Sequence, residues 1–391
     1  ASRRALATQA LQAIALLGSD VAVRALEDVA ERHGYDALGA FAMSALQAEA
    51  DARGISRDEL SDAVVPRWGM DARGRATLDY GRRQFYAVLL EDPTTWLNVK
   101  LTDEHGDEHP HLPRPGRTDD AALAHEALAR SKSLKHDLAG VIEASLRRFE
   151  RAMTEGRAWE LRAWRERVMG NAVLRALARR LVWSVSSPEV SERALVRPVD
   201  VGDAGDDFAL VDLAGDVIAL TETDTVSLVH PVALDGDTRA RWVAAFARAG
   251  LARQPLNQLR RRVFRVERDA GDGVAYEGLR GKVLKARSDR HGKAPQPWAR
   301  AGWEPAPTES GLCHAFLHRF GTTGLEAVLE VEGVALWAEA ARSTVVGALR
   351  FRAAHAGDDA AWIELARVPP AVVSEAVRGA LVMIEGGDRD V

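Results

Sequence analysis

The chain is organised around residues 254–265, whose sequence is QPLNQLRRRVFR. A polar entry that contains a proline leads there into a mixture of arginine and apolar residues. The segment from Thr238 to Ala249, which comes just before it, carries two aromatic residues at helical spacing and predicts a helix. Earlier still, the run 226–229 followed by His230-Pro231 predicts a strand that ends in a turn. Strand, turn, helix and arginine run therefore follow one another closely.

The arginine triplet gives two interpretations. If residues 259–263 are extended, Arg260 and Arg262 share one face and Arg261 turns to the other. Guanidinium groups can hold phosphate through paired donors. Arginine stems can also lie over apolar surface while their charged ends stay in water. Arg260, Arg261 and Arg262 are therefore candidate binding residues.

Length and composition limit the classes of protein. A chain of 391 residues can form two or three domains. Its hydrophobic content of 47% and charged content of 28% are typical of globular proteins, and a net charge of -5 predicts no overall attraction to nucleic acid or anionic membrane. The single cysteine, Cys313, excludes an internal disulfide and favours a reducing compartment. With no long apolar run and no signal-peptide pattern, we expect a cytoplasmic protein without membrane association.

The sequence predicts an α+β fold of four regions. Apolar residues recur at intervals of three and four through residues 1–70, which predicts helices of HEAT-like stacking. Residues 71–120 contain alternating sequence and then a polar loop, which predicts a small β-sheet and a loop. Residues 121–181 form a helical block. Residues 182–391 form an α+β C-terminal domain with a mixed, mainly antiparallel β-rich part, on which the N-terminal helices and the long basic helices pack.

The ends of the first region carry local signals. Ser56 followed by Glu59 predicts a capping box at a helix start. Because Ala1 leads directly into a helical pattern, the chain fits the C-terminal part of a longer protein as well as a start exposed by methionine removal.

The helical block is locally basic. Between residues 130 and 181 there are thirteen Lys and Arg against six Asp and Glu. The favoured interpretation is a solvated helix pair, and the alternative is a face that binds nucleic acid or an acidic partner. The candidate binding residues of this block are Arg147, Arg148, Arg151 and Arg180.

The most concentrated titratable cluster is the segment DEHGDEHPH at residues 103–111. His105, His109 and His111 are weak candidates for binding a transition metal, because imidazole suits such ions. The segment is interrupted by glycine and proline and lacks the spacing of structural zinc sites. A solvated hairpin tip is therefore favoured, and we expect no metal and no other cofactor.

Cys313, His314 and His318 form a second candidate cluster. The two histidines are four residues apart, as on one face of a possible helix. The glutamate of a metalloprotease motif is missing, since Ala315 follows His314. A small buried thiol is the favoured interpretation of Cys313.

No catalytic signature is found in the sequence. It contains neither a glycine-rich phosphate loop nor a Gly-x-Ser-x-Gly motif. An uncharacterised enzyme remains the alternative, with a site around His230, Gln254, Gln258 and Arg260. That alternative requires these side chains to converge on one cavity.

Short motifs follow one another in a fixed order from residue 59 to residue 378. They are ELSD (59–62), VPRWGMD (65–71), LDYG (78–81), LPRP (112–115), DD (119–120), RAW (157–159), RLVW (180–183), HP (230–231), Trp242, QPLNQLR (254–260), GW (302–303) and SEAVR (374–378). This order resembles the C-terminal domain of unknown function of bacterial MolR-like proteins, which are labelled molybdate metabolism regulators and carry WGR and HEAT-like regions.

The resemblance implies partners but no reaction, because the family has no established activity. It implies longer relatives with a WGR module, and genomic company with MoxR-type AAA+ ATPases and von Willebrand A-type proteins in conflict systems. The leading hypothesis is therefore a non-enzymatic interaction or effector-scaffold module that works with an AAA+ ATPase and nucleic acid.

Overall fold

A computed structural model describes residues 3–32, 37–188, 190–201, 207–266, 273–285, 296–308, 310–321, 323–335, 343–354 and 360–385. The chain forms two compact units, and each is assembled from separate stretches of sequence. The first unit contains Ala1–Ser145, Leu161–Arg179 and Val199–Ala209, and the second contains Leu146–Glu160, Arg180–Pro198 and Leu210–Val391. Both combine helices with antiparallel strand pairs, which confirms the predicted α+β class.

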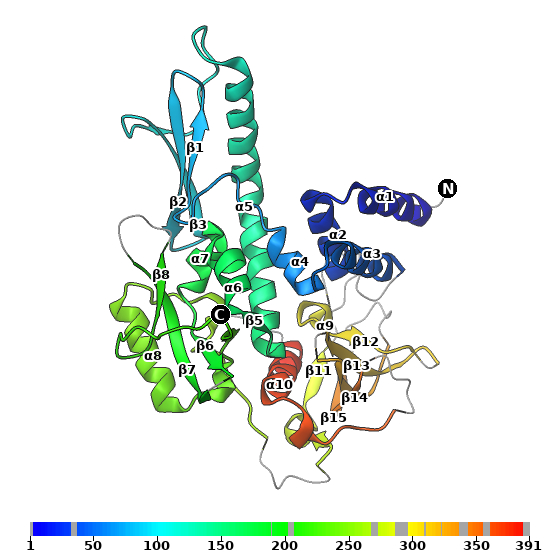
Figure 1. The fold of residues 1–391 in the computed structure, drawn as a ribbon. Helices are drawn as coiled ribbons and strands as arrows, with labels where there is room; N and C mark the ends of the chain where they lie inside the picture. Colours follow the sequence, from blue (N-terminus) through cyan, green and yellow to red (C-terminus); the bar gives the residue numbers. More distant parts are fainter. Residues whose placement is uncertain are drawn as a thin grey trace. The chain divides into compact units, whose positions relative to one another are not determined.

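Helices open the first unit (Figure 1). Their buried apolar residues, such as Leu26, Leu46 and Leu60, recur at helical spacing and form one core. The predicted capping box is confirmed, because Ser56 Oγ accepts from the Glu59 N–H at 3.2 Å and the Glu59 carboxylate accepts from the Ser56 N–H at 2.9 Å. These helices are α1 (Arg3–Leu17), α2 (Asp20–Arg32), α3 (Ala37–Arg53) and α4 (Arg57–Ala63).

A four-stranded antiparallel sheet follows, in the order β1-β2-β3-β4. Its alternating apolar residues, including Leu78, Phe85 and Leu101, pack with Ala127 and Leu134 of helix α5. Figure 1 shows the first three strands beside the N-terminal part of this long helix. The elements are β1 (Arg75–Asp79), β2 (Gln84–Asp92), β3 (Trp96–Asp103), β4 (Glu108–His109) and α5 (Ala121–Glu155).

The predicted helical block is interrupted shortly after α5 ends. Gly156 adopts φ +71°, and the Arg157 N–H donates to the Ala152 carbonyl at 3.0 Å, which is the geometry of a helix C-terminus. A strand comes next, where the sequence pattern predicts continued helix. The Asn171 side chain then caps the last helix of the block, because its Oδ1 accepts from the N–H groups of Val173 and Leu174. The elements are β5 (Ala158–Glu160), α6 (Leu161–Trp164), a π-helical turn η1 (Arg165–Met169) and α7 (Ala172–Ala178).

A five-stranded sheet has the order β5-β9-β6-β7-β8, and β7 and β8 carry the chain between the two units. Trp183 of β6 makes edge contacts with Trp159 and Phe149 in the second unit. Outside the named strands, Val217 forms an isolated bridge with Val211. The remaining strands are β6 (Trp183–Ser187), β7 (Val190–Asp200), β8 (Phe208–Val211) and β9 (Thr225–Leu228).

The segment after β9 confirms the predicted turn and helix. Trp242 and Phe246 of helix α8 are buried with Val182 and Leu259 in one core. The elements are the 3-10 turn η2 (Pro231–Ala233), α8 (Gly236–Arg248) and the 3-10 turn η3 (Pro255–Asn257).

The C-terminal part of the second unit is a sheet in the order β10-β15-β14-β13-β12, with β11 also paired to β15. Helix α10 lies beside this sheet in Figure 1 and shares its core through Val373, Ala376 and Val377. The elements are β10 (Ala275–Tyr276), η4 (Glu277–Leu279), β11 (Val283–Lys285), α9 (Pro297–Arg300), β12 (Glu304–Pro305), β13 (Cys313–Phe320), β14 (Leu325–Val334), β15 (Ser343–Ala353), η5 (Leu365–Arg367) and α10 (Pro370–Glu385).

One local prediction in this part is wrong. Cys313, His314 and His318 lie on strand β13, which pairs with β14, so the two histidines do not form a helical face. The pairing available to this strand outweighs the local pattern. Residues 360–364 are irregular and lead into η5. None of the described helices combines the length and apolarity that a membrane span requires.

Candidate functional site

The arginine triplet has one buried side chain and two exposed ones, but it does not form the strand on which the sequence argument depended, because Arg260 lies in a turn and Arg261 and Arg262 belong to no strand. The side chain of Arg261 is 1% exposed, whereas Arg260 and Arg262 are exposed. Residues 261–266 belong to no helix or strand. A buried guanidinium requires charged partners, and these come from distant parts of the second unit.

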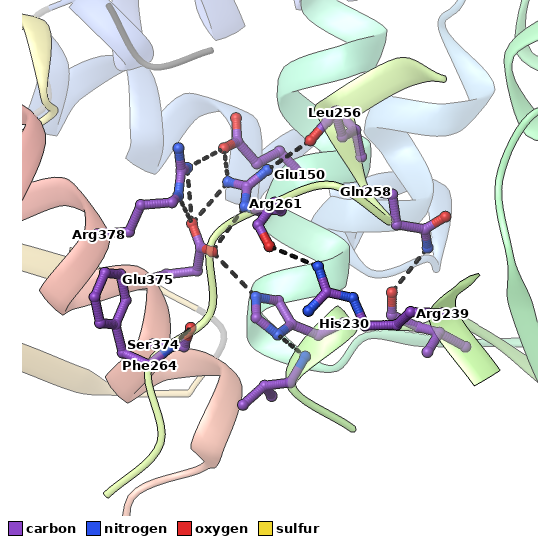
Figure 2. Close-up of polar contacts among 12 residues, drawn as sticks. Glu150, His230, Arg239, Leu256, Gln258, Arg261, Phe264, Ser374, Glu375 and Arg378 are labelled. Carbon is purple, nitrogen blue, oxygen red and sulfur yellow. Dashed lines mark hydrogen bonds and ion pairs between the residues drawn. The ribbon is translucent and has the colours of Figure 1, made fainter. Parts of the chain in front are cut away.

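Arg261 is paired with two glutamates (Figure 2). Its Nε donates to Glu375 Oε1 and its Nη2 to Glu375 Oε2, both at 2.7 Å. Nη2 also donates to Glu150 Oε1, near the C-terminus of α5. The pairing to Glu375 is bidentate, which fixes the orientation of both groups.

Arg378 repeats the arrangement from one turn further along α10. Its Nε donates to Glu375 Oε2 and its Nη2 to Glu150 Oε1, both at 2.9 Å. Two arginines and two glutamates thus share their charges, and the formal sum is zero. We call Glu150, His230, Arg261, Glu375 and Arg378 the Arg261 network.

His230 is the neutral member of the Arg261 network. Its Nδ1 accepts from the Val232 N–H at 3.1 Å, at the start of η2, so the ring proton resides on Nε2. Nε2 lies 3.0 Å from Glu375 Oε1 and donates to it. The predicted strand-end histidine therefore caps a turn and orients a carboxylate.

The protonation states follow from burial and charge. Burial lowers the pKa of His230, and the positive charges of Arg261 and Arg378 lower it further, against the opposing effect of Glu375. Burial raises the pKa of Glu375, but the His230 hydrogen bond and the two arginines outweigh it and hold this pKa well below the ordinary value. Burial also lowers the pKa of Arg261, whereas Glu375 and Glu150 raise it by more. His230 is therefore neutral near pH 7, whereas Glu375 and Arg261 are charged.

The lowered pKa of His230 predicts a loss of stability in mild acid. Below about pH 6.5 an unfolded histidine takes up a proton that the native His230 does not, so the free energy of unfolding falls by up to about 1.4 kcal/mol per pH unit. This loss continues until the pH reaches the folded-state pKa. His230→Gln keeps an N–H donor for Glu375 but does not titrate. Urea unfolding between pH 7.5 and 5 should therefore show a shallower decline for His230→Gln, and equal slopes would contradict the assignment.

The turn before Arg261 directs the Leu256 carbonyl toward the Arg261 guanidinium. Leu256 and Asn257 have φ of 61° and 49°, a left-handed conformation that side chains disfavour. The Leu256 carbonyl accepts from Arg261 Nη1 at 3.0 Å. Arg239 of α8 donates to the carbonyls of Leu259 and Arg261 at 2.8 and 3.0 Å. The strained turn is thus held by arginines on both sides.

The Gln258 side chain forms hydrogen bonds with the main chain of the residues that adjoin strands β6 and β9. Its Nε2 donates to the carbonyls of Val182 and Val229 at 2.9 and 2.8 Å, and its Oε1 accepts from the Val182 N–H at 2.8 Å. Its side chain is 0% exposed. This amide therefore closes the end of the sheet, with both its N–H groups in use.

The remaining residues of the alternative enzyme site lie in other settings. Gln254 is half-buried, and its Nε2 lies 3.4 Å from the Arg180 carbonyl. Arg260 is exposed. The structure brings His230 together with Arg261 through Glu375, in place of Arg260. Both ring nitrogens of His230 and both carboxylate oxygens of Glu375 are engaged by protein groups. The Arg261 network can therefore stabilise the fold, but neither side chain has an unengaged atom with which to act as a general acid or base.

The candidate binding arginines differ in exposure. Arg147 and Arg151 are exposed on α5, one turn apart, while Arg148 is buried between them. Arg180 is half-buried, and its Nη1 donates to the Arg253 carbonyl at 3.0 Å. The exposed members are thus Arg147, Arg151, Arg260 and Arg262.

Asp103 organises the histidine-rich loop. His109 Nε2 lies 3.1 Å from Asp103 Oδ2, and Asp103 Oδ1 accepts from the His105 N–H at 2.9 Å. His105 and His111 are exposed. Within the part of the chain that the structure describes, no three His, Cys, Asp or Glu residues are grouped so as to hold a metal ion.

Sequence reasoning missed Glu150, Glu375 and Arg378 as functional residues. A signal existed at residues 375 and 378, where an acid and a base three residues apart interrupt an otherwise apolar helix. Buried charges of this kind need partners, but the nearby sequence does not indicate which distant residues these partners are.

Comparisons with known proteins found one family model and one curated relative. Residues 106–292 match the sequence model of a family described as a domain of unknown function (DUF4132). The chain is also similar to the uncharacterized protein YehI of Escherichia coli (strain K12), with 28% identity over 322 residues, 82% of this chain and 25% of that protein. The chain thus spans about a quarter of the length of this relative. No solved structure matches significantly.

Proposed function

We propose that the chain is a non-enzymatic interaction module whose exposed arginines bind nucleic-acid phosphates. The observation that carries the proposal is the saturation of the Arg261 network by its own members and by main-chain groups. Buried charges satisfied in this way fix a shape, and the same unit presents exposed arginines at its surface.

Four exposed arginines are chain neighbours of the ion pair between Glu150 and Arg261. Arg147 and Arg151 flank Glu150 on the last turns of α5, and Glu150 pairs with Arg261. Arg260 and Arg262 are the chain neighbours of Arg261 and are exposed. The ion pair between Glu150 and Arg261 therefore holds Arg260 and Arg262 near the arginines of helix α5. Arginine is suited to phosphate because its donors are paired and permanently charged.

Salt dependence tests the proposal. We expect a fluorescein-labelled DNA duplex to bind the chain in an anisotropy titration, with an affinity that falls steeply between about 50 and 200 mM salt. Replacing Arg147 and Arg151 together by glutamine should reduce the slope of log affinity against log salt by about 2, since each phosphate contact contributes about 0.9.

The matched control is Arg241→Gln with Arg248→Gln, which removes two exposed arginines from α8. This pair should leave the slope of the native protein nearly unchanged. An affinity insensitive to salt, or an equal change in both double variants, would remove the nucleic-acid proposal.

The finer assignment is to a MolR-like bacterial protein that works in the cytoplasm with a MoxR-type AAA+ ATPase and a von Willebrand A-type protein. Its support is the ordered set of motifs between residues 59 and 378. The test is co-purification of the chain with such an ATPase in the presence of ATP. Failure of the pair to associate at micromolar concentration would reject this partner and leave the DNA experiment unaffected.

A further inference from the structure

A half-open cavity of about 270 Å³ lies within the first unit. Its walls come from the turn before β1, from β2 and β3, from α7 and from the end of β7. Leu89 and Leu97 provide apolar surface together with alanines of α7. The charged lining consists of Arg73, Glu91, Arg175, Arg179 and Asp200.

The turn that carries Arg73 is held tightly in place. Asp71 Oδ1 accepts from the N–H groups of Arg73 and Arg75 at 3.0 and 2.9 Å. Gly74 adopts φ +79°, and its carbonyl accepts from the Leu89 N–H at 2.8 Å. A Cβ at Gly74 would lie 2.6 Å from Leu89 Cβ, so only glycine lets the turn approach the strand this closely. The backbone at Arg73 is therefore positioned by the fold.

Another part of the lining holds two arginines around one carboxylate. Arg175 is 3% exposed, and its Nε and Nη2 donate to Asp200 Oδ1 at 2.9 and 2.7 Å. Arg179 Nη1 lies 2.8 Å from Asp200 Oδ2. The Nε of Arg179 is buried and has no hydrogen-bond partner among the residues that the structure describes. A donor of this wall thus remains unused beside the cavity, which is an unfavourable state for a buried group.

The lining has more positive than negative groups. Three guanidinium groups face two carboxylates, a formal excess of one positive charge. The volume is just below the range of about 300–1,000 Å³ for drug-sized ligand sites, so a small ligand fits. A guanidinium group binds phosphate through two parallel N–H donors. The leucine and alanine side chains of the lining offer apolar surface to the rest of a ligand.

We propose that this cavity binds a small organic phosphate monoester. The phosphate lies against Arg73 and Arg179, and its apolar part packs on Leu89 and Leu97. The inference is independent of the nucleic-acid function, because the cavity is formed within the first unit and the arginines of that function belong to the second.

Phenyl phosphate is the probe, and calorimetric titration of the full chain is the measurement. We expect saturable binding with a Kd of about 1 mM or tighter, and no binding of phenol at the same concentrations. Arg179→Gln should weaken binding of phenyl phosphate by at least about tenfold, because it removes a charge-assisted contact. Arg82→Gln, which removes an exposed arginine outside the cavity, should leave the affinity unchanged.

A second variant separates charge from fold. Ala176→Leu adds volume to the lining while keeping every charged residue, so it should abolish binding and leave the thermal unfolding of the free protein within about 2 °C of wild type. The proposal is overturned by wild-type protein that does not bind phenyl phosphate, by equal binding of phenol, or by wild-type affinity in both Arg179→Gln and Ala176→Leu.

Discussion

Arg261→Met is expected to lower the free energy of unfolding by about 3–5 kcal/mol, because it leaves Glu150 and Glu375 with Arg378 as their remaining arginine and so gives the buried network one negative charge in excess. Glu375 is the more affected carboxylate, as it receives two donors from Arg261. Methionine preserves the unbranched stem and most of the apolar packing. Urea unfolding followed by tryptophan fluorescence measures the change.

The exposed neighbour provides the control for this experiment. Arg260→Met should change the free energy of unfolding by no more than about 0.5 kcal/mol, as is usual for surface substitutions. Combining Arg261→Met with Glu375→Gln should cost about 1–3 kcal/mol less than the sum of the two single changes, since both remove the same interaction. Equal losses in Arg261→Met and Arg260→Met would show that the buried pairing is energetically unimportant.

Gln258→Leu is expected to cost about 3 kcal/mol. Leucine fills a similar volume but leaves the Val182 N–H and the Val229 carbonyl without the partners that Gln258 provides. Each buried main-chain group deprived of its hydrogen bond costs about 1–3 kcal/mol. The Val182 carbonyl keeps a second donor, the Val229 N–H at 3.2 Å, so it contributes less.

Gln254→Leu is the comparison for Gln258→Leu. Gln254 lies four residues earlier, is half-buried and makes one long contact at 3.4 Å. Its replacement should cost less than about 1 kcal/mol in the same unfolding assay. A larger loss for Gln254→Leu than for Gln258→Leu would reject the role assigned to the buried amide.

The sequence predicts much of the local structure, because local structure follows from spacing. The capping box of Ser56 and Glu59, the sheet from residue 75 onward and the helix with Trp242 are all present. The burial of Arg261 between two exposed arginines has another origin than the extended segment that the sequence argument assumed, since Arg260 ends a turn and the residues after it belong to no strand. Where strand pairing decides, as at Cys313 to His318, spacing alone misleads.

The candidate site could be predicted only in part. His230 and the arginine run are recognisable because each stands out against an apolar background. Their common partner, Glu375, is more than a hundred residues away in sequence, and no periodic pattern connects the two. The enzyme hypothesis grouped Gln254, Gln258 and Arg260 by nearness in the chain. The left-handed turn at Leu256 instead sends these side chains into different surroundings.

The position of Glu375 has a consequence for biosynthesis and for dissection of the chain. The region that matches the family model stops at residue 292, yet the carboxylate that neutralises Arg261 lies on the final described helix. During translation, more than a hundred further residues must leave the ribosome before Glu375, the bidentate partner of Arg261, can reach it. A fragment cut at the family boundary would carry Arg261 with only Glu150 to face it, and we expect such a fragment to be recovered as aggregate or proteolysed material.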